Sequence, residues 1–379
     1  MKRTKLLIPG PVELDSEVLL AMARPMMGHR TPDFEEVLEE CWRLLREVYQ
    51  TRNEVAIITG SGTSAMEAAV ASVIKEGDEV VSITGGKFGE RLAEIASAFG
   101  AEVKRVDVEW GSTFAVEQVE SAIAESNAVA ITLTHNETST GVLHDARAVG
   151  KLAREYDILF IADCITSVGG DDVRTDEWGI DLCITGSQKC LAAPPGLGFV
   201  AVSERAWEVI TNNTRRRAYY LDLARYRKAL ARGTTPFTPS VTLIYGLRAA
   251  LKKIEEEGLK ARIERHRRLA KATREAARAM NLELFAEQHC ASNTVTAIKI
   301  PPHLSDDDVR GVLKREYGIL VAGGQAQLKG KIFRIGHMGN VTFADLVQVL
   351  SALELVLKKA GHQLEPGKGV AAAERVFSG

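Results

Sequence analysis

The chain has 379 residues, which is too many for one ordinary hydrophobic core and is typical of about two domains. Its 48 Lys and Arg residues nearly balance its 50 Asp and Glu residues, so it lacks the concentrated basic field that binding to a nucleic acid or an anionic membrane requires. The 5 cysteines are scattered without C-x-x-C spacing, which argues against a disulfide framework or a metal site and predicts reduced thiols in a cytoplasmic protein.

The N-terminal segment is predicted to be an arm rather than part of a core. Its apolar run, Leu6–Ile8, is too short for the core of a signal peptide, and the Pro9-Gly10-Pro11 that follows is rigid and non-helical. A second turn at 26–32 precedes an amphipathic helix expected at about 34–49. We therefore expect residues 1–15 to lie across another part of the molecule.

From Glu54 the sequence alternates between apolar runs of strand length and segments with helical periodicity. The apolar runs are Val55–Thr59, Val80–Thr84, Val103–Val108, Ala128–Thr134, Ile158–Asp163, Leu182–Thr185 and Gly198–Val202. The helical segments between them include Ser64–Lys75, Phe88–Phe99, Val116–Glu125 and Ala146–Tyr156. Strands that are apolar on both faces and alternate with helices predict a largely parallel, doubly wound sheet in an α/β domain.

Beyond residue 240 the pattern changes to long helices and then to a looser alternation. Helices are expected at about 242–257 and 259–280, and the segments 294–300, 306–317, 332–335 and 343–359 are expected to be strand, helix, strand and helix. This predicts a smaller α+β domain over 258–379, with 16–257 as the large domain. The tail from Glu365 is expected to be either a loose end or a helix that docks late.

Two short basic runs, 215–217 and 262–268, stand out in this balanced chain. The second run alternates with apolar residues at helical spacing. It therefore predicts a helix face exposed to solvent rather than a stripe that binds nucleic acid.

Lys189 is the candidate catalytic residue. It follows the strand-like run 181–185 and precedes the turn Pro194-Pro195-Gly196, which places its amine at the end of a strand, where open α/β sheets bind ligands. A lysine in a dry pocket near other cations loses part of its proton affinity and can form a Schiff base with a carbonyl compound. The alternative is a solvated loop lysine, as most lysines are.

The segment Gly60-Ser61-Gly62-Thr63 follows the first apolar run and opens a helix. Its glycines let the backbone approach an anion at the positive end of the helix, where Ser61 and Thr63 add hydroxyls, and this predicts a phosphate cradle. The alternative is a plain turn in which Thr63 or Ser64 caps the helix. A dinucleotide site is disfavoured, because the next strand ends in Ser82–Gly86 without the acidic residue that would hold a ribose.

Asp163 ends an apolar run, 26 positions before Lys189. A carboxylate at the carboxyl end of a strand lies at the ligand edge of the sheet, where it can keep the nitrogen of a pyridine ring protonated. The alternative is a cap on a local turn. A phosphate cradle, a strand-end acid and a strand-end lysine, in this order on one sheet, form a more specific pattern than any one of them.

Three further positions have both a functional and a structural interpretation. Phe88, among glycines, is expected either to stack on a planar cofactor or to begin the next helix's core. The loop Thr134–Gly141, which includes Thr138, offers hydroxyls to a cofactor or is only a hydrophilic turn. Arg334 lies between apolar neighbours and is either a bidentate carboxylate ligand or an outward-facing strand residue.

Taken together, these motifs resemble the class V aminotransferases of the fold-type I pyridoxal-phosphate enzymes, in the alanine–glyoxylate, serine–glyoxylate and serine–pyruvate branch. The resemblance extends over nearly the whole chain. The matching motifs are Pro9-Gly10-Pro11, Gly28-His29-Arg30, Gly60-Ser61-Gly62-Thr63, His135 to Gly141, Asp163, Ser187-Gln188-Lys189, Pro194-Pro195-Gly196 and Arg334-Ile335-Gly336.

The resemblance implies a role for each candidate residue. Lys189 would hold pyridoxal 5'-phosphate as a Schiff base, and Asp163 would pair with the pyridine nitrogen. The phosphate would be bound by Ser61, Gly62, Thr63 and Gln188, the ring would be contacted by Phe88, Ile165 and Thr138, and the substrate would be bound by Arg334 and Gly10. The neighbouring subunit's phosphate would be reached by Thr238 and Thr235. Phe88 stands where relatives often carry Trp, and Thr235 where some carry Tyr.

The function expected from the resemblance is a homodimeric aminotransferase with a ping-pong mechanism and shared active sites. Alanine or serine would donate the amino group, and glyoxylate or pyruvate would accept it. One alternative is another pyridoxal-phosphate reaction, such as that of a cysteine desulfurase or a lyase, although desulfurases place His where this chain has Gln188 and carry a reactive cysteine on a loop that Cys290 does not match. The other alternative is a non-catalytic α/β protein that binds a phosphate-bearing ligand.

Overall fold

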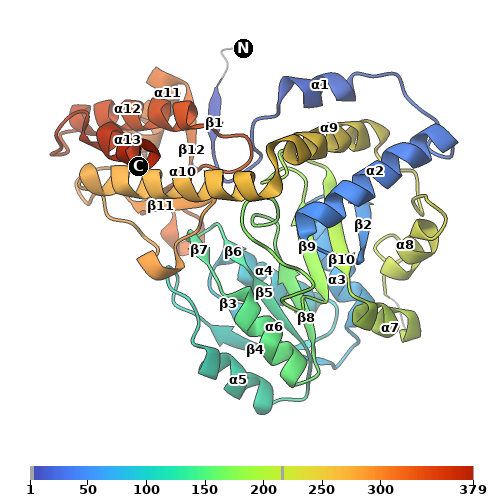
Figure 1. Ribbon diagram of the computed structural model, residues 1–379. Helices are drawn as coiled ribbons and strands as arrows, with labels where there is room; N and C mark the ends of the chain where they lie inside the picture. The colour runs from blue at the N-terminus through green and yellow to red at the C-terminus, as the bar shows by residue number, and fades with distance from the viewer. Residues whose placement is uncertain (1–3, 215–216, 379) are drawn as a thin grey trace.

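The computed structural model describes residues 4–214 and 217–378. Three parts of the predictions therefore lie outside the described residues: 1–3 of the arm, 215–216 of the first basic run, and Gly379 at the end of the small domain. Figure 1 shows a larger unit built around one sheet and a smaller unit built around another. The long helix α10 (Leu259–Ala279) runs across the smaller unit toward the larger one.

The large sheet has seven strands, and its carboxyl edge positions the candidate site. Their spatial order is β2 (Glu54–Thr59), β10 (Leu197–Val202), β9 (Leu182–Gly186), β8 (Leu159–Asp163), β5 (Ala128–Thr134), β3 (Glu79–Thr84) and β4 (Glu102–Asp107). β10 is antiparallel to both of its neighbours, and the pairings among β9, β8, β5, β3 and β4 are parallel. The predicted, largely parallel sheet is confirmed, and the direction of β10 is an addition to it.

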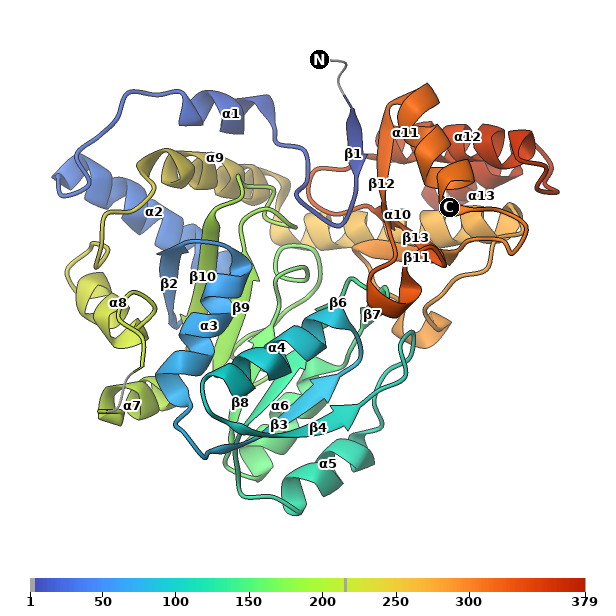
Figure 2. The same cartoon turned by 180° about the vertical axis from the view of Figure 1, so that it is seen from behind.

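Both faces of the sheet are covered because side chains alternate along each strand. Phe160 joins the buried cluster on one face, and Ile161 joins the cluster on the other. The first face packs against α2 (Pro32–Tyr49), α5 (Val116–Ala124), α6 (Ala146–Glu155) and α9 (Val241–Glu257). The second face packs against α3 (Gly62–Val73), α4 (Lys87–Ala98), α7 (Glu204–Asn212) and α8 (Leu223–Leu230). Figure 2 shows α3 and α4 in front of the sheet.

The smaller unit contains a four-stranded sheet in the order β1 (Lys5–Leu7), β12 (Ile319–Gly323), β13 (Ile332–Gly336) and β11 (Val295–Lys299). Its core lies between this sheet and the helices α10, α11 (Val312–Tyr317), α12 (Phe343–Lys359) and α13 (Lys368–Ser378). The prediction that the N-terminal arm is not part of a core is wrong at Leu7, because the arm supplies an edge strand whose Leu7 is buried in the core of the smaller unit. Lys5 pairs with Asp345 of α12 at 2.7 Å. The division of the chain at Gly258 stays a prediction, and it coincides with the break between α9 and α10.

Several short elements were not foreseen from the sequence. They are α1 (Ser16–Met22), the pair β6 (Asn136–Glu137) and β7 (Val142–Leu143), α7, α8 and β12. The tail after Glu365 forms α13, which packs against α10, so the helical alternative is the one observed. The described residues include no helix with the length and apolar character needed to span a membrane.

Candidate active site

The candidate residues meet at the carboxyl ends of two adjacent parallel strands. Asp163 is the last residue of β8, and Lys189 lies just beyond the end of β9. Both face a cavity of about 110 Å³. The cavity is lined by Ser61, Gly62, Thr63, Phe88, Arg91, Asn136, Thr138, Asp163, Ile165, Thr166, Gln188 and Lys189. The structure therefore brings together the predicted lysine, acid, phosphate cradle and ring contacts.

Lys189 is covered by the N-terminal arm. Its Nζ donates a hydrogen bond to the Pro9 carbonyl oxygen. Gly10 adopts a φ of +84°, and a Cβ atom there would lie 2.5 Å from Lys189 Cδ. Burial lowers the pKa of Lys189 to about 8, with a smaller lowering by the charge of Arg334, while Asp163 opposes the shift. The amine is thus partly neutral near physiological pH, as a nucleophile or base requires.

Asp163 is a buried carboxyl group in the same cavity. Its Oδ1 accepts a hydrogen bond of 2.9 Å from the Ile165 amide. Burial raises the pKa of Asp163 to about 7, and the hydrogen bond from Ile165 and the charge of Lys189 partly oppose this shift. A positive charge placed beside this carboxyl group would favour its ionised form, so the site is suited to a cationic ring nitrogen.

The predicted phosphate cradle lies at the start of α3. Ser61 is the N-cap residue and makes no side-chain capping hydrogen bond, and the first amides of a helix have no partner within the helix. A Cβ atom at Gly62 would lie 2.6 Å from Ile165 Cδ1, so a side chain there would displace the Ile165 side chain that lines the cavity. The Gln188 Oε1 atom is buried and has no hydrogen-bond partner among the described residues.

Phe88 is half-buried at the start of α4, with its ring at the cavity. Glu137 fixes this turn, because its Oε2 accepts hydrogen bonds from the Phe88 amide at 2.9 Å and the Gly89 amide at 3.0 Å. The Arg91 guanidinium lies 4.9 Å from the centre of the Phe88 ring. Phe88 belongs to neither buried cluster of the large unit, which favours the cofactor-stacking interpretation over the core one.

Arg334 lies on β13 of the smaller unit and reaches the edge of the site. Its Nη1 donates to the Thr138 carbonyl at 2.7 Å, and its Nε and Nη2 donate to the Gly323 carbonyl at 3.0 and 2.7 Å. Its side chain is buried rather than facing outward, and burial lowers its pKa to about 10. The guanidinium contacts the backbone of cavity-lining Thr138 but does not itself line the cavity.

Thr235 and Thr238 do not line this cavity. The Thr235 hydroxyl donates to the Phe237 carbonyl at 2.8 Å, and exposed Thr238 lies 3.5 Å from the His29 ring nitrogen. Their predicted contact with a neighbouring subunit's phosphate stays a prediction.

Arg91, Asn136 and Thr166 line the cavity but were not singled out from the sequence. Arg91 lies one helical turn after Phe88, and i, i+3 spacing places both on one face of α4. Asn136 belongs to the polar loop noted above, and its Nδ2 donates to the Thr166 carbonyl at 3.1 Å, which fixes the orientation of its amide. Spacing and loop polarity were therefore signals that could have identified two of these residues.

Comparison with known proteins identifies the class. The family model described as "Aminotransferase class-V" matches residues 16–344. An uncharacterized aminotransferase of Methanocaldococcus jannaschii is 47% identical over 98% of this chain and 97% of its own length. A protein named soluble hydrogenase, small subunit, from Synechococcus is 41% identical over 99% of both chains. The crystal structure of ureidoglycine–glyoxylate aminotransferase from Bacillus subtilis superposes with a TM-score of 0.96 at 36% identity, covering 100% of this chain and 99% of that one.

These similarities cover nearly the whole chain and include both units, so they confirm the fold expected from the sequence. The protein is a transaminase by class. It belongs to the class V aminotransferase family.

Proposed function

We propose that the protein is a pyridoxal-phosphate-dependent aminotransferase that moves the amino group of alanine or serine to glyoxylate or pyruvate by a ping-pong mechanism. The observation that carries the proposal is the meeting of Lys189 and Asp163, both held in a largely buried cavity, opposite the amino end of α3. Glyoxylate as acceptor is also supported by the similarity to the Bacillus subtilis ureidoglycine–glyoxylate aminotransferase.

The residues present fit the cofactor. The amino end of α3 and the glycine at position 62 suit a phosphate group that needs close backbone approach. The buried carboxyl of Asp163 suits a protonated ring nitrogen, and the Gln188 side-chain amide offers a hydrogen-bond donor beside the same cradle. When bound, pyridoxal phosphate supplies an electron sink for the charge that develops at the substrate's α-carbon.

In the proposed mechanism Lys189 both attaches the cofactor and moves the proton. Its lowered pKa keeps part of the amine neutral. The neutral amine could take the proton from the substrate's α-carbon and return it to the carbon on the other side of the substrate nitrogen. Asp163, which is buried, would stabilise a positive charge on the ring nitrogen through an ion pair, and its burial would strengthen that pair. Arg334 binds the substrate carboxylate through two parallel N–H donors, in place of part of its contacts to carbonyl oxygens.

We further propose that the active form is a homodimer in which Thr238 and Thr235 complete the partner's phosphate site. The segment that carries both threonines is held against the turn before α2, because Arg30 Nη1 donates to the Thr235 carbonyl at 2.6 Å. Large apolar side chains are exposed on α1, on the turn that follows it and on the segment before α8. They are Leu19, Leu20, Met26, Met27, Tyr219 and Tyr220. Exposed apolar side chains of this number are typical of a surface that another chain covers.

Attachment of the cofactor should depend on pH in the direction set by Lys189. The neutral amine is the nucleophile, and a pKa of about 8 means that its fraction falls about tenfold for each pH unit below that value. We expect the rate of adduct formation in cofactor-free protein to rise with pH and to level off above about 8, as measured by stopped-flow absorbance. A rate that continues to rise beyond pH 10 would indicate an ordinary solvated lysine and contradict the burial argument.

The test of the proposed function is the absorption spectrum of protein supplied with pyridoxal phosphate, recorded before and after addition of L-alanine or L-serine. We expect a visible band that bleaches with the amino acid and returns with glyoxylate or pyruvate. Borohydride reduction followed by peptide mass analysis should place the cofactor on Lys189. Release of sulfide or ammonia without an acceptor would favour the desulfurase or lyase alternative, and the absence of any band would favour a non-catalytic binding protein.

A further inference from the structure

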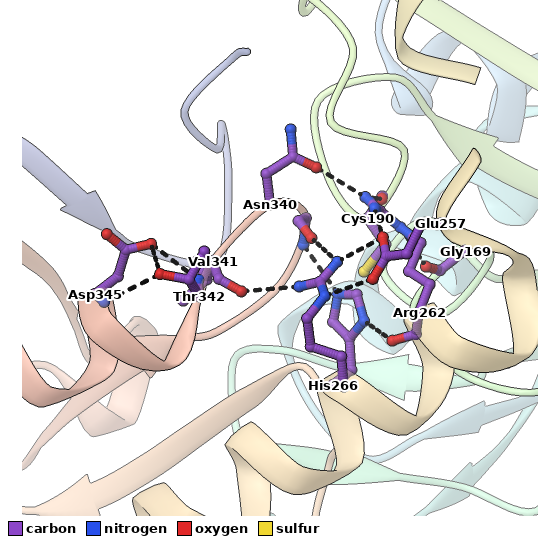
Figure 3. Close-up of polar contacts among 11 residues, drawn as sticks. Gly169, Cys190, Glu257, Arg262, His266, Asn340, Val341, Thr342 and Asp345 are labelled. Atoms are coloured by element: carbon purple, nitrogen blue, oxygen red, sulfur yellow. Dashed lines mark hydrogen bonds and ion pairs between the residues drawn. The ribbon is translucent and has the colours of Figure 1, made fainter. Parts of the chain in front are cut away.

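Arg262, in the first turn of α10, is buried beneath the loop that carries Lys189. Only 1% of its surface is exposed, so the solvated helix face predicted for the run 262–268 is wrong at this position, although Glu264 and Arg267 of the run are exposed. Its Nη2 donates to the Cys190 carbonyl at 2.8 Å, its Nε to the Gly169 carbonyl at 3.2 Å, and its Nη1 pairs with Glu257 at 2.7 Å. Figure 3 shows these contacts converging on the guanidinium. Arg262 therefore binds the backbone one residue beyond Lys189.

The same part of α10 binds the loop that follows β13. Arg262 Nη2 also donates to Asn340 Oδ1 at 3.2 Å, and the Gly339 amide donates to His266 Nε2 at 3.0 Å. Because Nε2 accepts this hydrogen bond, the ring proton is on Nδ1, which donates to the Arg262 carbonyl at 2.7 Å. Burial, reinforced by the charge of Arg262, holds the pKa of His266 well below its usual range, which maintains this neutral form. Arg265 adds hydrogen bonds to the carbonyls of Gly339 and Val341.

Gly339 brings this loop close to the backbone of Lys189. Its φ is +74°, and a Cβ atom at this position would lie 3.4 Å from the Lys189 carbonyl oxygen and 2.9 Å from Val12 Cγ2. The loop begins where β13 ends, so the strand that carries Arg334 continues directly into the segment that passes beside the Lys189 backbone. Arg262 thus joins the two units beside the site, through the Cys190 backbone carbonyl on the large unit and the Asn340 side chain on the smaller one.

We propose that Arg262 is a positioning residue that sets the distance between the Lys189 amine and the Arg334 guanidinium. This inference rests on the proposed function, in which the amine acts at the α-carbon while the guanidinium binds the adjacent carboxylate. The α-carbon and the carboxylate carbon of the substrate are one bond apart. The distance between the Lys189 amine and the Arg334 guanidinium must therefore be fixed. A misplacement of about 1 Å can lower the rate about 10²-fold.

Stability alone does not account for an arginine at this position. Replacing a buried ionic group with a well-packed apolar side chain of similar size is often neutral or stabilising. Glu257 would keep a partner in Arg265, whose Nε lies 2.6 Å from its Oε1. The directional hydrogen bonds from one guanidinium to Cys190, Gly169 and Asn340 are what an apolar side chain cannot supply.

The test compares Arg262→Met with a control on the same helix. The control is Arg268→Met, because the hydrogen bond and ring contact described for the Arg268 side chain are both with α13. Arg268 donates to the Phe377 carbonyl at 2.9 Å, and its guanidinium lies 4.5 Å from the centre of the Phe377 ring. We expect Arg262→Met to keep the lysine–cofactor band and to lower kcat/KM for L-alanine about 10- to 100-fold. In protein without cofactor, hydrogen–deuterium exchange should become faster at residues 190–193. Arg268→Met should change neither quantity.

A double-mutant cycle with Arg334→Gln separates positioning from general destabilisation. Once the Arg334 guanidinium is absent, its distance from the Lys189 amine no longer affects the rate. The factor by which Arg262→Met lowers kcat/KM should therefore be about tenfold smaller in the Arg334→Gln background than in the wild-type background. Additive effects, or an Arg262→Met variant that behaves like the control, would overturn the inference. If Arg262→Met does not fold, Asn340→Ala removes only the hydrogen bond from Arg262 to the loop that follows β13, and the same non-additivity is required of it. A wild-type protein without a lysine adduct would instead refute the proposed function.

Discussion

Lys189→Ala is expected to abolish transaminase turnover, with a loss of at least about 10³-fold in kcat, because the change removes both the attachment point and the proton-transferring base. The variant should still bind the cofactor without covalent attachment, since the phosphate cradle and Asp163 are untouched. Turnover is measured with L-alanine and glyoxylate, and attachment by borohydride trapping.

Lys104→Ala is the matched control for this variant. Lys104 lies on β4 at the far edge of the large sheet and pairs with Glu125 at 3.3 Å, away from the cavity. Its removal should leave turnover unchanged. Full transaminase activity in Lys189→Ala would refute the catalytic assignment.

Asp163→Asn is expected to lower kcat about 10²- to 10³-fold, as removal of one charge-stabilising group at a reaction centre does. Asparagine keeps the shape and can still accept the hydrogen bond from the Ile165 amide, but it cannot hold a ring nitrogen positive. The loss should appear in the half-reaction with L-alanine as well as in steady state. A variant with normal rates in both assays would show that the carboxyl group is only a turn cap.

The same variant should make the cofactor-free protein more stable at pH 8. Asp163 has a folded-state pKa of about 7 against an ordinary value of 3.8, so ionisation is easier in the unfolded chain. The resulting destabilisation is absent below about pH 4, grows as the pH rises to 7 and is then constant. Its removal should raise the free energy of unfolding at pH 8 by about 1–4 kcal/mol and change it little at pH 4, as measured by urea unfolding. Equal effects at both pH values would contradict this account.

The fold was largely predictable because its signals are local. The bounds of β5 and α12 agree with the sequence expectation to the residue, since each is a long patterned run that stops at a clear change in composition. The direction of β10 was not predicted, because side-chain alternation is the same in either direction. Short elements such as α8 and β12 are too brief for periodicity to distinguish them from loops.

The site residues were predictable where a chemically reactive residue type lies at the carboxyl end of a predicted strand. Lys189 and Asp163 could be located in this way, and the glycines at 60 and 62 marked the turn before α3. Arg262 could not, because its partners Cys190 and Asn340 lie 72 and 78 positions away in the chain, and spacing on its own helix indicates only which face it shares. The helical spacing of the run 262–268 predicted that Arg262 is exposed to solvent. This prediction failed because tertiary hydrogen bonds satisfy the buried guanidinium.

The antiparallel placement of β10 has a consequence for how this protein could acquire new specificities. Parallel neighbours need a crossover of a dozen or more residues, but β9 and β10 are joined by only the segment 187–196, which carries Lys189. This segment is closed by hydrogen bonds from the Ser187 amide to the Leu197 carbonyl and from the Ala193 amide to the Ser187 carbonyl, each 3.0 Å long. Mutations that reshape the wall contributed by α4 can therefore accumulate while the backbone that carries the reactive amine keeps its place.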